Sequence, residues 1–505
     1  MLKRNIIANF IGQGWTALMG LAFIPLYIQY LGVEAYGLIG VFALIQAWLM
    51  LLDVGMTPAL SREMARFNGG AHSAQSIRNL LRSVEVIGFL LALLVSLTIW
   101  GLSGWLASNW LQVEKLHIDV VSQAFIIMGV VAGLRFIENI YRSSIIGLEK
   151  QVTLNVVNAV LATIRSVGAI GVLIWIAPTI SAFFIWQGVM SLITVIFFAV
   201  ILYKNLPVSQ QSSRFSVSAI KNIWRFAGGV AAITFLSFLL MQTDKILLSK
   251  FLSLEQFGYY SLAALVANSL FMIVAPIDLA FFPRLTSQVS QDNQSALIST
   301  FHMGSQLITV FVGVAAVILI VFGDVVLSLW TQDTALAKSI APLLAILALG
   351  TMFNCFMHMP YQLQLANGWT SLTIKVNTIA VILLVPAIFW AAPKHGALGV
   401  ACDWVILNMS YVIFAVHFMF NRLLTTEKLN WYIKDITIPL VAAIFVAVIL
   451  RWLIPNDMNQ LSWLLTLFFC SILIFLATVL AAPLVRKPIC NYLLKMMQPY
   501  FIGKS

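Results

Sequence analysis

Apolar stretches of about 20 residues follow one another along almost the whole chain. An α-helix rises about 1.5 Å per residue, so such a stretch crosses the roughly 30 Å hydrocarbon core of a bilayer. Of the 505 residues, 61% are hydrophobic and 9% are charged, whereas a soluble domain carries about 25% charged residues. The pattern excludes a water-soluble fold and predicts an all-α polytopic membrane protein with about fourteen transmembrane helices. We expect them over residues 5–31, 36–60, 82–108, 118–146, 152–177, 180–203, 223–251, 257–283, 299–330, 336–366, 371–392, 397–421, 433–454 and 461–483.

The basic residues lie mostly in alternate turns between these stretches. Because Lys and Arg are retained on the cytoplasmic side, this distribution predicts a multi-pass protein with both termini in the cytoplasm. The opposite side then holds only Lys115, Lys250, Lys338, Lys394 and Arg451. The formal net charge of +11 therefore reports topology. Short, scattered basic loops do not favour nucleic acid as a partner.

An internal repeat is present. The turn at 31–37 reads LGVEAYG, and the turn at 252–258, offset by 221 residues (252 minus 31), reads LSLEQFG. A second match, offset by 219 residues (366 minus 147), pairs GLEKQVTLNVVN at 147–158 with ANGWTSLTIKVN at 366–377. Two matches at nearly one offset predict duplicated bundles of six helices each.

Because six is an even number, the two lobes run parallel and are related by an axis along the membrane normal. We expect an N-lobe at 1–205, a cytoplasmic linker at 206–222, a C-lobe at 223–421, and two further helices with a cytoplasmic tail at 422–505. Two such lobes around a central cleft can open it alternately to either side, which is the architecture of a transporter.

The opening of the chain is its most specific part. It reads NFIGQGWTALMGLAFIPLYIQYLGVEAYGLIGVFALIQAWLMLLDVGMTPALSREMAR. With its LG-x-E-x-YG turn and its Ser61-Arg62-Glu63 ending, the chain resembles, over its full length, the multidrug/oligosaccharidyl-lipid/polysaccharide flippase superfamily. Within that superfamily it is most similar to the Wzx-type flippases of polysaccharide repeat units (O-antigen or capsule). The resemblance implies a MATE-like fold in the bacterial inner membrane, a cavity lined by Arg and Lys, and undecaprenyl-diphosphate-linked oligosaccharides as substrates. A polysaccharide polymerase and a chain-length regulator are further partners that it suggests, besides the membrane lipids.

Ionisable residues at membrane depth are costly and mark functional sites. The fourth helix carries Arg135, Glu138, Asn139 and Arg142 at spacings of three, four and seven, which puts them on one face. Such a polar stripe must face the protein interior. The offset of 219 places three residues of the tenth helix at the positions of Arg135, Asn139 and Arg142, and these are Asn354, His358 and Tyr361.

The fifth helix adds Asn158 and, near mid-depth, Arg165. We expect Arg135 and Arg165 to meet at one level of the N-lobe and to bind a diphosphate, with Arg142 as a further candidate, because two arginines with one intervening acid leave positive charge uncompensated. The polar residues of both stripes are expected to line the substrate cavity, where the asparagines hydrogen-bond to the sugars. The alternative is a structural ion pair of Arg135 with Glu138.

Three aspartates and one lysine are weaker candidates for functional residues. Asp53 and Asp278 occupy nearly repeated places beside prolines, and either could cap a broken helix or bind a coupling proton. Asp244 and Lys245 are adjacent, so their side chains point about 100° apart on a helix. Lys245 could line the cavity or snorkel to the outer interface.

No cofactor or metal site is expected. The four cysteines lack a CxxC pair or a His partner at ligand spacing, and no phosphate loop, HExxH or GxSxG motif occurs. We therefore expect a flippase for a lipid diphosphate oligosaccharide and no enzyme. A multidrug or organic-cation antiporter of the same superfamily should have an acidic cavity, and a membrane glycosyltransferase or polymerase should have large outer loops and a carboxylate cluster.

Overall fold

The computed structural model describes residues 2–53, 55–68, 70, 72–207, 212–455 and 458–487, with side chains for all of these except 2–7, 10, 50 and 222–234. The predicted linker at 206–222 and the predicted tail thus lie partly outside the described residues. The described chain is helical, and within it a single bridge, between Gln112 and Ser253, pairs extended backbone. By packing, the chain divides into two compact units, Met1–Gly258 (unit 1) and Tyr259–Ser505 (unit 2).

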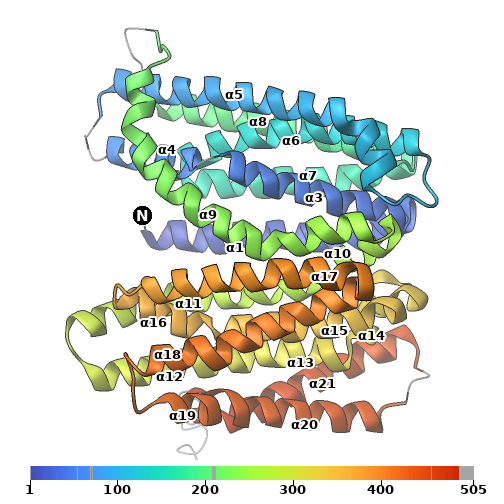
Figure 1. Cartoon of the computed structure of the whole chain (residues 1–505), viewed down its shortest axis with the longest axis vertical. Helices are drawn as coiled ribbons and strands as arrows, with labels where there is room; N and C mark the ends of the chain where they lie inside the picture. The colour runs from blue at the N-terminus through green and yellow to red at the C-terminus, as the bar shows by residue number, and fades with distance from the viewer. Residues whose placement is uncertain are drawn as a thin grey trace, which may run out of the picture. The chain divides into compact units, whose positions relative to one another are not determined.

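Unit 1 is a bundle of long helices (Figure 1). Its helices are α1 (Leu2–Ala22), α2 (Ile24–Leu31), α3 (Val33–Leu52), α4 (Met56–Asn68), α5 (Ala74–Trp105), α6 (Ile118–Gly147), α7 (Gln151–Trp175), α8 (Ile180–Asn205), α9 (Val217–Phe251) and the start of α10 (Leu254–Asn268), with a π-helical turn η1 (Leu106–Trp110). Helix α6 packs against both α5 and α8, and its Val121, Ala124 and Met128 are fully buried. The helix that carries the polar stripe is therefore inside the bundle.

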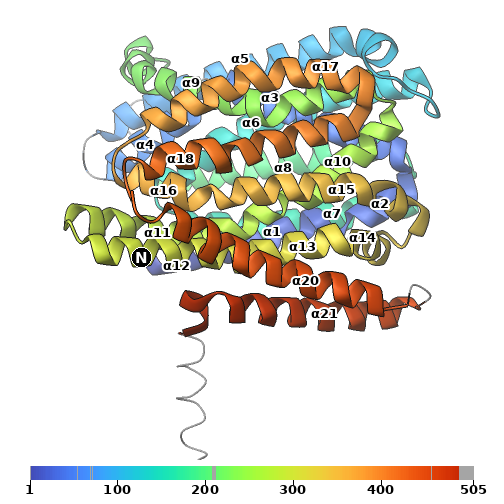
Figure 2. The same cartoon turned by 60° about the horizontal axis from the view of Figure 1, so that its bottom comes forward.

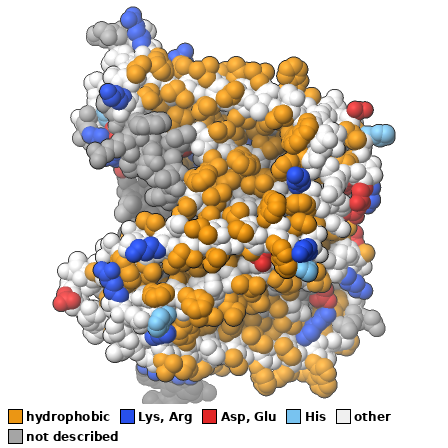
Figure 3. All heavy atoms as spheres, in the orientation of Figure 1, with side chains coloured by type: hydrophobic (Ala, Val, Ile, Leu, Met, Phe, Trp, Pro, Cys, Tyr) orange, Lys and Arg blue, Asp and Glu red, His pale blue; other side chains and the backbone are white. Residues whose placement is uncertain are grey.

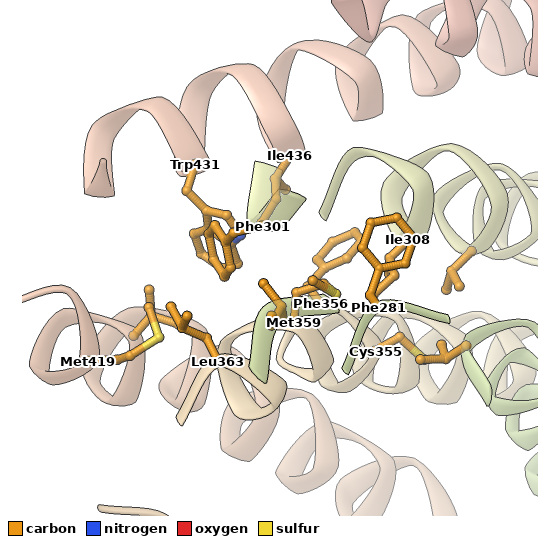
Figure 4. Packing of buried hydrophobic residues seen from close by; sticks show 14 of the residues in the cluster. Phe281, Phe301, Ile308, Cys355, Phe356, Met359, Leu363, Met419, Trp431 and Ile436 are labelled. Carbon is orange, nitrogen blue, oxygen red and sulfur yellow. The ribbon is translucent and has the colours of Figure 1, made fainter. Parts of the chain in front are cut away.

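Unit 2 is a second helical bundle. Its helices are α11 (Leu270–Ser290), α12 (Gln294–Ile308), η2 (Thr309–Gly313), α13 (Val314–Val321), α14 (Gly323–Thr331), α15 (Thr334–Phe356), α16 (His358–Ala366), α17 (Ser371–Ser410), η3 (Tyr411–Ala415), α18 (Val416–Phe420), α19 (Lys428–Asn430), η4 (Trp431–Thr437), α20 (Ile438–Leu453) and α21 (Gln460–Ala481). Figure 4 shows its core, where Phe281, Phe301, Met359 and Trp431 converge from four elements. Helices α20 and α21 lie side by side along one edge of the unit (Figure 2).

Eleven described helices are long and apolar enough to cross a membrane, and α3 has a shorter apolar stretch, Val33–Leu49. One of the eleven, Ser371–Phe420, has 50 residues and breaks at Gly396, where φ is 57°. That length suffices for two crossings. The predicted number of about fourteen is not confirmed by this count.

Large hydrophobic side chains are exposed on both units. Examples are Leu90 and Leu94 on α5, and Phe445 and Trp452 on α20. Figure 3 shows a face covered largely by hydrophobic side chains. Since soluble proteins rarely expose contiguous apolar patches beyond a few hundred Å², these surfaces fit contact with lipid.

The predicted repeat is visible in the backbone hydrogen bonds. After α6, the N–H groups of residues 148, 149 and 150 donate to the carbonyls of residues 144, 146 and 145. After α16, the N–H groups of residues 367, 368 and 369 donate to the carbonyls of residues 363, 365 and 364, which is the same pattern 219 residues later. The left-handed position is repeated too, with φ of 58° at Glu149 and 65° at Gly368. The two turns therefore share one geometry.

The first pair of matching turns is in contact. A Cβ atom added at Gly37 would lie 2.3 Å from the carbonyl oxygen of Leu254, and one added at Gly258 would lie 2.7 Å from the carbonyl oxygen of Val33. Each glycine thus admits the backbone of the other turn, as glycine does where two backbones approach closely. The contact is reciprocal, as a two-fold relation between the turns requires.

The division by packing differs from the predicted lobe boundary. Helix α9 was expected to begin the second lobe, but it packs against α3, α4 and α5 of unit 1. The two boundaries differ because tertiary contacts decide which bundle α9 packs against, and the turn sequences do not specify these contacts. That the chain repeats in two sets of six helices stays a prediction from the sequence. It concerns the order of the helices and not which of them are in contact.

Candidate functional site

Arg135 of α6 points to neutral partners. Its Nη1 donates to Gln46 Oε1 of α3 at 2.6 Å, and its Nη2 donates to Gln187 Oε1 of α8 at 3.1 Å. The guanidinium carbon lies 5.2 Å from the ring centroid of Phe42. Its Nε is buried without a hydrogen-bond partner. These contacts hold the side chain in place without neutralising its charge.

Arg165 of α7 has the acid that Arg135 lacks. Its Nη2 lies 3.6 Å from Glu138 Oε2 and donates to Thr194 Oγ1 of α8 at 3.1 Å. The backbone carbonyl of Arg165 accepts from Trp186 Nε1 at 2.9 Å. The alternative prediction, an ion pair of Arg135 with Glu138, is therefore wrong, because Glu138 pairs with Arg165 instead.

The two arginines lie on the same side of α8. Their partners Gln187 and Thr194 are seven residues apart, which is two turns or about 10 Å along a helix, and the guanidinium groups are within electrostatic reach of each other. Among the described residues, no carboxylate lies within ion-pair distance of Arg135. Two cations thus share one acid, and the cluster carries a surplus positive charge. Buried guanidinium groups with unused N–H donors are suited to an anion that accepts two hydrogen bonds.

The rest of the stripe is less constrained. Arg142 is half-buried, Asn139 is exposed, and neither has a hydrogen bond or ion pair to another described side chain. Asn158 donates to Thr16 Oγ1 of α1 at 3.0 Å. Lys245 lies 3.6 Å from Asp244 and donates to the carbonyl of Met241 at 2.9 Å. Lys245 is therefore tied to its own helix.

The matching face of unit 2 has different chemistry. Asn354 Nδ2 donates to Asn408 Oδ1 at 2.6 Å, and His358 Nδ1 lies 2.7 Å from Asp278 Oδ2. Tyr361 is exposed. Where unit 1 has arginines, unit 2 has an amide pair and an imidazole with a carboxylate.

Asp53 does not repeat the place of Asp278. Asp53 lies at the break between α3 and α4 and caps α4, accepting from Thr57 N at 3.1 Å and from Thr57 Oγ1 at 2.9 Å. Asp278 lies within α11, between two prolines. The prediction of repeated places is wrong because spacing to a proline does not identify which side of a helix break a residue occupies.

Several polar partners were not predicted. His302 of α12 contacts two acids, Asp435 of η4 through Nδ1 and Glu427 through Nε2 at 3.1 Å, and Gln306 donates to Asp435 at 2.9 Å. Asp403 of α17 has a buried oxygen without a hydrogen-bond partner. His302, Asp435 and Asp403 all lie within predicted spans, so the rule that drew attention to Arg135 applied to them equally. The described residues contain no group of three His, Cys, Asp or Glu that could hold a metal ion.

A buried carboxylate with basic partners lies on α4, toward the end predicted to be cytoplasmic. Glu63 is buried and contacts His72 at 2.7 Å and Arg66 at 3.0 Å. Burial raises the pKa of this carboxyl, but the hydrogen bonds from His72 and Arg66 outweigh it, and the pKa of Glu63 is lowered. The carboxylate therefore stays charged and fixes the loop that follows α4.

The fold is that of known transporters. A solved structure of the lipid II flippase MurJ in an inward closed conformation matches with a TM-score of 0.68 at 14% identity, covering 94% of this chain and 97% of that one. An inward-facing multidrug resistance MATE family transporter of the MOP superfamily matches with a TM-score of 0.65 at 15% identity, covering 82% of this chain and 96% of that one. Fold and apolar surface together define a multi-pass helical membrane protein.

The family described as polysaccharide biosynthesis protein matches residues 2–289, more than half of the chain, and the chain belongs to this family. A protein of Shigella flexneri named "Putative O-antigen transporter" is 21% identical over 409 residues, which are 80% of this chain and 94% of that protein. The chain is thus a multi-pass helical membrane protein of the polysaccharide biosynthesis family.

Proposed function

We propose that this protein flips undecaprenyl-diphosphate-linked oligosaccharide repeat units from the cytoplasmic to the periplasmic leaflet of the bacterial inner membrane, by alternating access. The single observation that carries the proposal is the cation surplus in unit 1, where Arg135 has only neutral partners and Arg165 has the one nearby acid. Membership in a polysaccharide biosynthesis family supports the substrate class. Both chain termini would lie in the cytoplasm.

A diphosphate fits these groups chemically. Its oxygens accept paired hydrogen bonds from guanidinium groups, and Nε of both arginines is buried and unused. An uncompensated buried charge is costly, so a doubly charged headgroup would relieve the repulsion between Arg135 and Arg165. Arg142, which has no described partner, lies about two turns after Arg135 on α6 and would serve as an earlier contact.

The remaining contacts follow from the same arrangement. Sugars would hydrogen-bond to amide groups of unit 1 such as those of Asn139 and Asn158. The isoprenoid tail would stay in the bilayer. Outward movement of negative charge through an inside-negative potential releases about 2.3 kcal/mol per charge per 100 mV, so the headgroup's charge assists the step. A polymerase and a chain-length regulator would act on the product.

A second candidate is an organic-cation antiporter. It is favoured by the likeness to MATE transporters and by the carboxylates of unit 2, Asp278 and Asp403 among them. The polysaccharide family match favours the flippase.

Complementation with matched variants tests the proposal. Arg135→Ala and Arg165→Ala are expected to lower surface polysaccharide about tenfold or more and to trap lipid-linked oligosaccharide on the inner leaflet, since a charged hydrogen bond contributes roughly 1.5–3 kcal/mol. Arg135→Lys should restore part of the activity because it keeps the charge. Lys338→Ala, an exposed basic residue, serves as the control. Normal polysaccharide in both alanine variants at normal protein levels would refute the cationic site, and drug efflux lost in their place would favour the antiporter.

A further inference from the structure

The Asp278–His358 pair joins two interrupted helices of unit 2. Asp278 lies in α11 between Pro276 and Pro283. His358 is the first residue of α16, directly after the break at Met357 that ends α15, and Pro360 follows it. Proline removes a backbone hydrogen bond and bends a helix. Both partners therefore sit where the backbone is least held by its own helix, and α11 and α16 pack against each other.

The pair has room for one more proton. His358 Nδ1 lies 2.7 Å from Asp278 Oδ2, while Asp278 Oδ1 is buried without a hydrogen-bond partner. The imidazole side chain keeps 28% of its surface exposed. With a neutral imidazole donating from Nδ1, the pair carries one negative charge; a proton added at Nε2 makes it a neutral imidazolium–carboxylate pair.

No other described charge balances this pair. Phe271 lies beside the imidazole, with ring centroids 6.2 Å apart, and the buried Cys355 thiol is near Asp278. His302 is held by Asp435 and Glu427. The other titratable or charged groups on α11 and on the elements packed against α11 and α16 are Arg284, Lys338, Tyr361 and His417, and none forms an ion pair with Asp278 or His358 in the described part of the chain.

The repeat makes this feature specific to unit 2. Residue 358 corresponds to residue 139 at the offset of 219, and residue 139 is an asparagine, which does not titrate. Histidine is the side chain whose charge ordinarily changes between about pH 5 and pH 8. A change of charge at this position thus acts on unit 2 alone.

We propose that the Asp278–His358 pair is a proton-binding site, and that its occupancy sets the contact between α11 and α16. Protonation converts a charged pair into a neutral one and tightens its hydrogen bond. Loss of the proton leaves a buried negative charge and loosens the helix break. A link between this contact and transport rests on the proposed flippase function. The proton-binding site itself does not depend on that function.

Hydrogen–deuterium exchange of the full-length protein in nanodiscs tests the site. After correction for intrinsic rates, the amides of residues 356–366 should exchange several-fold faster at about pH 8 than at about pH 5.5. Asp278→Asn and His358→Gln should each abolish this difference. His417→Gln, whose histidine contacts Lys428 on another element, should retain it. No pH difference in the wild type, or an unchanged one in both variants, would overturn the proposal.

A second measurement separates this proposal from the flippase proposal. Proteoliposomes with a fluorescent undecaprenyl-diphosphate sugar should flip it several-fold faster when a pH gradient is imposed. His358→Gln should flip it at one rate with and without the gradient. Flipping without any gradient effect would overturn coupling alone. Absence of flipping by the wild type would count against the proposed function, with the exchange result still deciding the proton site. Unfolding temperatures near the wild-type value show that the variants are folded.

Discussion

The polar interiors of the two units differ in the sign of their charge. In unit 1, Glu138 is the one acid near Arg135 and Arg165 and pairs with Arg165. The other hydrogen bonds of the two guanidinium groups go to neutral Gln and Thr side chains. In unit 2, two buried or half-buried carboxylates are contacted by an imidazole, Asp278 by His358 and Asp435 by His302. One interior is suited to an anionic ligand, and the other to protons.

This difference arises on a shared backbone. The turns after α6 and α16 repeat the same three hydrogen bonds and the same left-handed residue. The positions one to three turns before them hold Arg135, Asn139 and Arg142 in one case, and Asn354, His358 and Tyr361 in the other. Turn chemistry thus fixes the helix register, while a few interior substitutions fix what each unit can bind.

The largest effect should come from the most buried acid of unit 2. Asp435 is 1% exposed and contacts His302 and Gln306. Asp435→Asn leaves an imidazole facing an amide and should destabilise the protein by roughly 3–5 kcal/mol, the cost of breaking a buried pair. Thermal unfolding in detergent measures it. Glu427→Gln, at the more exposed end of the cluster, should cost clearly less, and equal costs would contradict this gradient of burial.

The next effect tests the cation surplus of unit 1. Glu138→Gln removes the one acid of the cluster and should destabilise the protein by about 3 kcal/mol. Because both arginines then lack a counter-charge, an added undecaprenyl diphosphate should raise the unfolding temperature more in this variant than in the wild type. An equal or smaller shift in the variant would show that the two arginines do not bind the diphosphate together.

A third comparison concerns close packing. Gly37→Ala in unit 1 would place a Cβ 2.3 Å from the backbone oxygen of Leu254, whereas Gly304→Ala in unit 2 would meet the flexible end of Met359 at 2.5 Å. Backbone cannot yield as a methionine tip can, so we expect losses of roughly 1–3 kcal/mol for Gly37→Ala and about 1 kcal/mol or less for Gly304→Ala. Unfolding temperatures of the two variants decide this, and the reverse order would break it.

The smallest effect is a pH dependence in unit 1. The pKa of Glu63 is lowered in the folded protein, so its contribution to stability is present above the ordinary carboxyl pKa of about 4.3 and is lost as the pH falls through the folded value. Since Arg66 is half exposed, the contribution should be about 1 kcal/mol or less. Glu63→Gln should therefore lose less stability than the wild type as the pH falls from about 5 to about 3. Parallel pH profiles of the two proteins would exclude this role.

Local spacing in the sequence predicted much of this architecture. It could not predict which residues of different helices contact one another. The helix breaks of both repeats and the buried stripe of α6 follow from residues within about four positions of one another. The partners of Arg135 come from α3 and α8, and Asp435 lies 133 residues from His302. Neutral residues such as Gln46 and Gln187 give no signal in a sequence. The pairing of Glu138 with Arg165 was not predicted, because the two residues are on different helices and the sequence does not specify that contact.

The mutual contact of Gly37 and Gly258 has a consequence for how such a chain can diverge. Each of the two turns packs directly against the backbone of the other, so a side chain at either glycine would collide with the main chain of the other turn. The two interiors differ in charge, but a side chain at either glycine would require the backbone of the other turn to move. Hybrids that exchange halves between relatives should therefore assemble only when both glycines are retained.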